Sequence, residues 1–281
     1  MRRLLLISAL SALFSLPAFA QGGPCIPVRS GGDLPYQAGE TLRYTLSYNW
    51  HAVATDVASG ALAVDTTTLN GKKVFHATMT ARTAKFFDVF FKMREGFQSW
   101  FTVDGIEPQR FIRDTHEGSY YAWNLYQYDW REKVIRAELE DRNKPRYHLD
   151  IPFGDCTYDL PALLYFTRNM DVSRLRNGTA YHITFAIDDA VYVLTLTFKG
   201  RERKYVKGLG TVATMKFGCS VVAGEMFEGD EDAVLWISDD DNRIPVFFMA
   251  PLKVGACTGR LSSYEGLKHP FTSLQSAKKI K

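Results

Sequence analysis

Apolar and polar residues alternate with a period of two from Gly39 almost to the C-terminus, and this alternation most constrains how the chain can fold. In Glu40–Tyr48 it places two leucines and two tyrosines on one face and polar residues on the other. Such a segment is typical of a half-buried antiparallel strand. Further segments repeat the pattern between turn signals about ten residues apart, as in a β-meander. The sequence therefore predicts an all-β, mainly antiparallel fold: a large curved meander sheet or an open barrel.

The expected hairpin turns follow from residues that favour tight turns. Asn70-Gly71 and Asp104-Gly105 are common two-residue connections, and Asp129–Glu132 and Asp188–Ala190 join other alternating segments. About a dozen strands result. No linker rich in proline, glycine or serine divides them, so we expect a single β-rich domain at residues 21–267.

Two segments depart from the alternation. Asp159–Arg168 predicts a helix, because Asp159 can cap its N-terminus, Pro161 suits the first turn and apolar residues form one face. We expect this helix to pack on or inside the sheet. Arg82–Arg94 carries four phenylalanines among charged residues, and it predicts a second short helix or an aromatic edge.

The hairpin Trp236–Val246 joins two apolar runs through three consecutive aspartates. The structural interpretation places the Trp236 indole in the core and pairs Arg243 with one of the acids Asp239–Asp241, while Pro245 lies at an edge or starts a strand. In the functional alternative, Trp236 and Arg243 face a ligand cavity and hold an acidic or sugar-like group.

The first twenty residues are organised like a secretory signal peptide. Arg2 and Arg3 precede the apolar run Leu4–Leu16, and Ala18-Phe19-Ala20 offers a cleavage site. The apolar run is too short to span a bilayer. We therefore expect residues 1–20 to be removed by cleavage near Ala20. The mature protein is expected to be periplasmic or secreted and not integral to a membrane.

The net charge of the chain limits the classes of partner that we expect it to bind. Loss of the two leader arginines lowers the formal charge from +3 to +1, so neither nucleic acid nor an acidic membrane surface is implied. Residues 268–281 are expected to form a basic flexible tail.

An even number of cysteines in an oxidising compartment favours two disulfides over one, with three connectivities open. The four cysteines are Cys25, Cys156, Cys219 and Cys257.

The sequence lacks the local signatures of common active sites. It contains no G-x-S-x-G, H-E-x-x-H, phosphate-loop or G-x-G-x-x-G motif and no CxxC pair. We therefore expect no cofactor and no metal, and an enzyme only if distant residues assemble a site. The acid clusters Asp188-Asp189, Asp230–Asp232 and Asp239–Asp241 could supply the paired carboxylates of a carbohydrate-active enzyme, although each falls at an expected turn.

Aromatic residues make up 14% of the chain and are dense at 86–101 and 120–130. In Ser119–Tyr128, alternation places Tyr121 and Trp123 together, but both faces of this segment carry rings. Aromatic side chains suit half-buried sheet positions, and they also line concave sites for apolar or sugar-like ligands. The candidate ligand-binding residues are therefore Tyr121, Trp123, Trp236 and Arg243.

Three groups of residues resemble a known family. They are Gly39-Glu40-x-Leu42-x-Tyr44, then Asp159 with Leu163 and Arg168, then Trp236-x-Ser238-x-Asp240-x-x-Arg243-x-Pro245. The resemblance is to the bacterial envelope family called domain of unknown function 3108, over Leu34–Tyr264, and it carries no established activity. Long hairpins with helices inside a curved sheet are also similar to the half-barrels of periplasmic lipoprotein carriers, which shield acyl chains. This likeness of architecture does not identify functional residues in the chain.

Together these features predict an exported envelope protein that binds or carries a hydrophobic or amphipathic ligand, either lipid-like or a glycan. One alternative is a carbohydrate-active enzyme that uses carboxylates at the rim of the sheet. The other is an envelope assembly factor without a small ligand, which a fully packed sheet interior would favour.

Overall fold

The structure is a computed structural model and describes residues 28, 33–50, 53–222, 233–252 and 254–277. The predicted signal peptide, Cys25 and the acids Asp230–Asp232 lie outside the described residues. The strands of the first half are β1 (Glu40–Trp50), β2 (Val53–Leu69), β3 (Lys72–Thr83), β4 (Met93–Thr102), β5 (Pro108–Glu117), β6 (Tyr120–Asp129), β7 (Val134–Asp141), β8 (Tyr147–Pro152) and β9 (Thr157–Tyr158).

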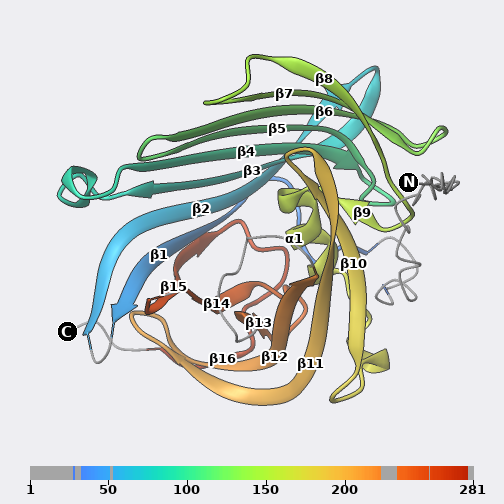
Figure 1. Cartoon of the computed structure of the whole chain (residues 1–281). Coiled ribbons are helices and arrows are strands. Elements are labelled where there is room, and N and C mark those ends of the chain that lie inside the picture. Colours follow the sequence, from blue (N-terminus) through green and yellow to red (C-terminus); the bar gives the residue numbers. More distant parts are fainter. Residues whose placement is uncertain (1–27, 29–32, 51–52, 223–232, 253, 278–281) are drawn as a thin grey trace, which may run out of the picture.

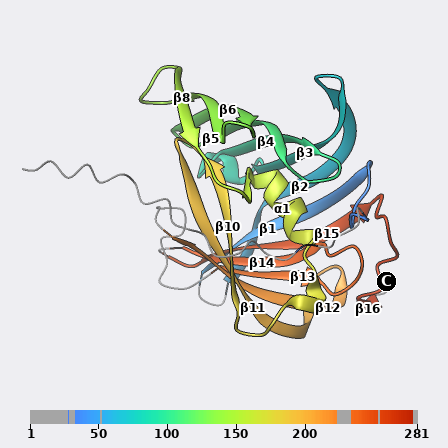
Figure 2. The same cartoon turned by 90° about the vertical axis from the view of Figure 1, so that its right-hand side faces the viewer.

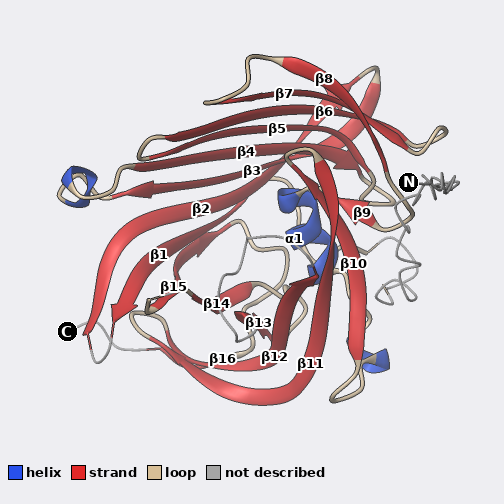
Figure 3. Cartoon of the chain, viewed as in Figure 1, coloured by secondary structure: helices blue, strands red, loops and turns tan. Residues whose placement is uncertain are grey.

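The second half begins with α1 (Leu160–Arg168), the one α-helix among the described residues. Its strands are β10 (Ala180–Ile187), β11 (Ala190–Val206), β12 (Gly210–Val222), β13 (Ala233–Ser238), β14 (Pro245–Pro251), β15 (Ala256–Glu265) and β16 (Leu274–Ala277). Two short 3₁₀ helices are η1 (Phe87–Val89) and η2 (Val172–Arg174). Strands dominate both halves, as Figure 3 shows.

One sheet contains all sixteen strands (Figure 1). Its path runs β8-β7-β6-β5-β4-β3-β2-β1 and continues β15-β14-β13-β12-β11-β10-β9, with β16 paired to β12 off the path. Two meanders are thus joined where β1 pairs antiparallel with β15. The pairing of β9 with β10 is parallel. Among the described strands, the path ends β8 and β9 do not pair with each other, so the sheet curves without closing. The predicted fold class is confirmed.

The turn between β2 and β3 illustrates how local sequence sets the meander. Asn70 and Gly71 have φ values of 50° and 74°, in the left-handed region that a tight two-residue hairpin requires. Asparagine and glycine tolerate that region better than other residues. This two-residue turn places Leu69 opposite Lys72 in the ladder.

Helix α1 lies inside the curve of the sheet, as Figure 2 shows. Asp159 caps it, because one carboxylate oxygen accepts a hydrogen bond from the Ala162 amide at 3.0 Å. The other oxygen accepts from the Ser99 hydroxyl at 2.8 Å, which ties the helix start to β4. Leu163 and Phe166 are buried on the inner side. The predicted helix is confirmed.

The segment 82–94 forms the end of β3, the 3₁₀ turn η1 and the start of β4. The expected short helix is thus a single turn at the tip of the β3–β4 hairpin. Most of its aromatic rings face solvent instead of packing on the sheet.

Buried apolar side chains form two clusters inside the sheet. The first surrounds α1 and includes Leu42, Phe101, Tyr165, Phe217 and Ile237. The second lies under β4–β8 and includes Phe111, Tyr126, Ile135, Leu139 and Phe153. Each such side chain contributes about 1.5–3 kcal/mol when fully buried, so these clusters hold the curved sheet on its helix.

The described part of the predicted flexible tail belongs to the fold. Lys268 donates hydrogen bonds to the Asp33 carboxylate and the Leu34 carbonyl, and β16 pairs antiparallel with Gly210–Val212. Backbone pairing with β12 thus holds residues 274–277 of this segment in the sheet. Residues 278–281 lie outside the described residues.

The prediction of two disulfides is wrong. Cys156 is disulfide-bonded, whereas Cys257 on β15 carries a free thiol. Cys257 is partly buried beside β1, where it is paired with Tyr48, and burial raises the pKa of its thiol. A second disulfide would need another cysteine within bonding distance of Cys257. Which cysteines lie that close depends on the tertiary structure and cannot be read from the sequence.

Candidate functional site

The residues of the family-like motifs meet at the C-terminal end of α1. Both carboxylate oxygens of Glu40 accept hydrogen bonds from Arg168, at 2.5 and 2.8 Å. The same guanidinium donates to the Asn242 carbonyl at 3.1 and 3.0 Å. Nearby, the Tyr44 hydroxyl donates to the Pro245 carbonyl at 2.9 Å. These motif residues fasten α1 to β1 and to the turn between β13 and β14.

That turn is organised by Asp240, which accepts from the backbone amides of Asn242 and Arg243 at 3.1 and 3.2 Å. The Arg243 guanidinium is buried and donates to the carbonyls of Arg168 and Met170. The prediction that this side chain pairs with one of the three aspartates is therefore wrong. Its hydrogen bonds go instead to backbone carbonyls at and just after the C-terminal end of α1.

Trp236 is only 5% exposed and belongs to the core cluster around α1, as the structural interpretation predicts. Its Nε1 donates to Glu202 at 2.6 Å, and the Lys204 ammonium lies 4.0 Å from the ring centroid. The ring meets Phe247 edge-on at 5.4 Å. Pro245 begins β14, also as predicted.

Tyr121 and Trp123 lie on β6, with half-buried rings on the face opposite the core residues Ala122 and Tyr126. The Arg146 guanidinium packs 4.1 Å from the centroid of Trp123. Strands β5 to β1, β15 and β14 separate this pair from Trp236 in the sheet. The four candidate ligand residues therefore do not form one site.

A cavity of about 910 Å³ lies on the inner face of the sheet, between β3–β6 and the hairpin of β10 and β11. Its walls come mainly from apolar side chains, with a smaller set of charged ones. The apolar residues are Met79, Ala81, Phe97, Leu160, Ile187 and Tyr192. The charged residues are Glu95, Arg113, Glu117 and Asp188. None of the four sequence-predicted ligand residues lines this cavity.

A chain of polar contacts crosses the cavity wall. The Thr115 hydroxyl donates to Glu95 at 2.6 Å and accepts from Arg113 Nε at 2.9 Å. Arg113 Nη1 donates to Asp188 at 2.5 Å, and the Tyr126 hydroxyl donates to the Asp188 carbonyl at 2.6 Å. These bonds join β4, β5 and β6 to the turn between β10 and β11. They fix the charged groups in the wall of the cavity.

Glu95 has the most perturbed carboxyl group of the cavity. Burial raises its pKa to about 7, an effect that the nearby Glu117 reinforces and the Thr115 hydrogen bond opposes. Its Oε1 is buried and has no hydrogen-bond partner in the described part of the chain. Near neutral pH this oxygen can therefore serve as donor or acceptor to a bound group.

Sequence reasoning missed this cavity. The available signal was the alternation in β4, which places Glu95 on the same face as the buried residues Phe97, Ser99 and Phe101. A carboxylate at an inward position is costly unless it is paired or functional. Asp188, which pairs with Arg113, lies 75 positions further along the chain. No local sequence pattern indicates that these two residues meet.

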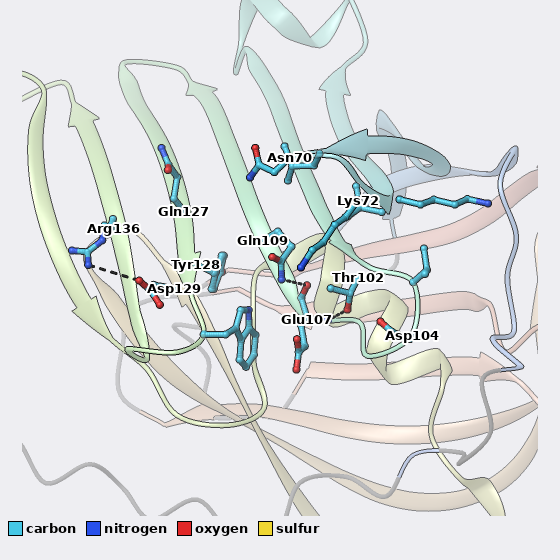
Figure 4. A pocket seen from close by; sticks show the side chains of 15 residues that line it. Asn70, Lys72, Thr102, Asp104, Glu107, Gln109, Gln127, Tyr128, Asp129 and Arg136 are labelled. Carbon is cyan, nitrogen blue, oxygen red and sulfur yellow. Dashed lines mark hydrogen bonds and ion pairs between the residues drawn. The ribbon is translucent and has the colours of Figure 1, made fainter.

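A second hollow, of about 680 Å³, lies at the far ends of β2–β7 and is shown in Figure 4. Its polar groups already contact one another. Gln109 donates to the Glu107 carbonyl at 3.3 Å, and Arg136 lies 3.8 Å from Asp129. This hollow is an exposed polar groove between hairpin ends, so it is a weaker candidate than the apolar cavity.

The predicted acid clusters that the structure describes, Asp188-Asp189 and Asp239–Asp241, lie at separate turns. Asp239 pairs with Arg201 at 2.9 Å, and Asp240 supports its own turn. Of the cluster acids that the structure describes, Asp188 is the one that lines the cavity. Within the described ranges no group of three or more His, Cys, Asp or Glu could hold a metal ion. Nor does that part of the chain contain a helix long and apolar enough to cross a membrane.

Comparison with known proteins gives a family and a fold. The model of the family "Protein of unknown function (DUF3108)" matches residues 43–262. Among solved structures, the β-barrel-like protein of domain of unknown function DUF1849 from Brucella abortus aligns with a TM-score of 0.52 at 12% identity, covering 82% of this chain and 98% of that chain. A protein with YmcC-like fold from Bacteroides fragilis aligns with a TM-score of 0.36 at 10% identity, over 86% of this chain and 100% of that one. No curated protein matches the sequence. The match of the family model over most of the chain shows that the protein belongs to the DUF3108 family of proteins of unknown function.

Proposed function

We propose that the protein is an exported binding protein that holds the apolar part of an amphipathic ligand in the cavity between β3–β6 and the β10–β11 hairpin. The observation that carries this proposal is the cavity, in which apolar walls surround a few fixed charged groups. Small-molecule sites typically enclose about 300–1,000 Å³ and have this composition. The cavity of about 910 Å³ lies within that range.

The charges of the cavity favour one kind of head group. Three carboxyl groups, those of Glu95, Glu117 and Asp188, accompany one guanidinium, that of Arg113. Arg113 is already paired with Asp188. A ligand that donates hydrogen bonds or carries a positive charge would therefore be favoured, and a free carboxylate would be repelled. The buried Glu95 Oε1 would accept one of the donated bonds.

The exported location is supported by the start of the sequence, where two arginines, an apolar run and Ala18-Phe19-Ala20 follow one another. N-terminal sequencing of protein recovered from the periplasm tests this part of the proposal. The expected first residue is Gln21, and a chain that still begins at Met1 would contradict export by cleavage.

Ligand binding is best tested with three probes that share one alkyl chain: dodecylamine, dodecyl maltoside and dodecanoate. Native mass spectrometry and competition with a fluorescent alkyl probe would measure their binding. Ala81→Trp places a large ring at a cavity wall, so it should abolish binding. Gln109→Trp adds the same ring to the polar groove of Figure 4 and is the matched control. The amine and the maltoside should bind the parent and Gln109→Trp alike, and dodecanoate should bind less well.

Other outcomes would favour the alternatives. Equal binding by Ala81→Trp and the parent would place the ligand outside the cavity and overturn the proposal. A parent protein that binds none of the probes would favour an assembly factor without a small ligand. Hydrolysis of the maltoside, lost in Glu95→Gln, would favour a carbohydrate-active enzyme with a carboxyl group that the turn clusters do not contain.

A further inference from the structure

Four apolar side chains at the end of the β3–β4 hairpin face solvent. Phe86, Val89, Phe90 and Phe91 are 74%, 85%, 77% and 50% exposed. The first three are the most exposed large apolar side chains in the described structure. They surround η1, which projects beyond the ends of the neighbouring strands (Figure 1). We call residues 86–91 the aromatic tip.

Four backbone amides of the aromatic tip, those of Phe87, Asp88, Phe90 and Phe91, donate hydrogen bonds within the hairpin. The Phe87 amide donates to the Ala84 carbonyl at 2.8 Å, and the amides of Phe90 and Phe91 donate to the Phe87 carbonyl at 2.9 Å. A backbone group without a partner is costly in the apolar part of a bilayer. The tip can therefore enter the apolar part of a bilayer without leaving these amides unpaired.

Basic side chains surround the tip. Arg82, Lys85 and Lys92 are exposed. The single acid of the segment, Asp88, is held by Arg94 at 2.6 and 3.0 Å, and hydrogen bonds from Arg94 and Thr83 lower its pKa to about 2. Segment 82–94 thus carries four basic residues and one acid, a local excess that the nearly neutral chain conceals.

The tip also lies beside residues that line the cavity. The Gly118 amide donates to the Lys92 carbonyl at 2.7 Å, and the Phe91 ring packs so close to Gly118 that a Cβ there would lie 3.7 Å from it. Gly118 connects β5 to β6, and the adjoining residues Glu117 and Tyr120 line the cavity. A surface that binds the tip would therefore lie near this wall of the cavity.

We propose that the aromatic tip docks the protein on membranes that carry anionic phospholipid, with its rings in the headgroup region and its basic residues on the lipid phosphates. Apolar side chains flanked by lysine and arginine bind in this way, through buried apolar area and attraction to anionic lipid. A stable protein partner would need roughly 800 Å² of matching surface, which a narrow projecting tip of six residues does not provide. Docking by the tip does not depend on the ligand proposed for the cavity.

The test is co-sedimentation of the full mature chain with vesicles of phosphatidylcholine alone and with vesicles that also contain phosphatidylglycerol. Phe86→Ser/Phe90→Ser removes the two most exposed rings. Tyr205→Ser changes a 58% exposed ring near the other end of β11 and is the matched control. Since these side chains are exposed, the melting temperatures should stay close to that of the parent.

The parent and Tyr205→Ser should bind the anionic vesicles more tightly than the neutral ones. The double Ser variant should bind them roughly tenfold more weakly or worse. Lys85→Gln/Lys92→Gln should lose about fivefold per lysine at low salt and show a smaller dependence on salt. A parent that does not bind anionic vesicles, or a double Ser variant that binds like the parent, would overturn the proposal. So would dimerisation through the tip without vesicle binding.

Discussion

Arg168 and Glu40, 128 positions apart in the sequence, form a two-bond ion pair in which neither side chain is exposed to solvent. The guanidinium also donates to the carbonyls of Asn242 and Pro35, and it lies 5.3 Å from the ring centroids of Tyr36 and Tyr165. One side chain thereby joins the end of α1, the start of β1 and the turn between β13 and β14. We infer that this pair holds the helix inside the sheet.

Breaking the pair should be costly. Arg168→Met leaves the Glu40 carboxylate buried without a partner, and the free energy of unfolding should fall by about 3–5 kcal/mol. Urea unfolding followed by tryptophan fluorescence measures this. The double variant Glu40→Leu/Arg168→Met should lose less than the sum of the two single changes, because no lone charge remains. Costs that simply add would contradict the coupling.

An exposed pair provides the control. Arg43 and Glu265 lie 2.9 Å apart with side chains 46% and 67% exposed. Glu265→Gln should change the free energy of unfolding by less than about 1 kcal/mol, since exposed ion pairs are screened by water. A similar loss at both pairs would mean that burial does not set the cost.

Stability should depend on the ionisation of Asp159. Its burial raises the pKa to about 7, although hydrogen bonds from Ala162 and Ser99 oppose this. In the unfolded chain the carboxyl has a pKa of about 3.9. The folded state thus retains the proton between about pH 4 and pH 7, so the group's contribution to stability is greatest below pH 4 and is lost as pH rises through 7.

The variant Asp159→Asn provides the control, because its side chain cannot titrate. The stability of the parent relative to Asp159→Asn should fall over this interval and then level off. Urea unfolding at several pH values tests this, and a constant difference would refute it.

Trp236 should matter mainly for stability. Trp236→Ala removes a buried ring and its hydrogen bond to Glu202, which should lower the free energy of unfolding by about 3–5 kcal/mol. Trp123→Ala removes a half-buried ring on the outer face and should cost about 1 kcal/mol. Thermal unfolding of both variants makes the comparison. A stable Trp236→Ala protein that had lost ligand binding would instead support the functional interpretation of this residue.

Arg243 combines a buried side chain with an unusual backbone. Arg243→Ala leaves the carbonyls of Arg168 and Met170 without this donor, which should cost about 2–3 kcal/mol, more than an exposed pair would. The residue has a φ of 48°, which glycine adopts more readily than alanine. Arg243→Gly should therefore be more stable than Arg243→Ala by about 1 kcal/mol. Urea midpoints in the order parent, Gly, Ala are expected, and Ala above Gly would rule out the backbone effect.

The sequence alone determined the elements whose causes are local. Alternation within each strand, the Asn70-Gly71 turn and the cap that Asp159 provides for α1 all act over a few residues. They predicted an all-β, mainly antiparallel sheet with one or two short helices on or inside it, and the structure confirms this fold class. Trp236 is buried, as the structural interpretation of its apolar run predicted, although the sequence alone also allowed a ligand-facing position.

Only the tertiary structure decided how distant segments pair and which face of each strand is buried. β6 carries rings on both faces, so alternation could not reveal that Tyr126 is buried while Tyr121 and Trp123 lie on the opposite face. Arg243 was predicted to contact the acids of its own turn, but its guanidinium donates to the carbonyls of Arg168 and Met170, which the fold brings beside it.

The cavity shows most clearly what the sequence alone could not predict. Glu95 and Arg113 lie on neighbouring strands, but Asp188 reaches Arg113 only because the curved sheet brings the β10–β11 hairpin across to them. The burial that raises the pKa of Glu95 also depends on everything packed around it. Short-range patterns set secondary structure, whereas burial and charge pairing are sums over contacts from the whole chain, and those contacts exist only once the sheet has curved around α1.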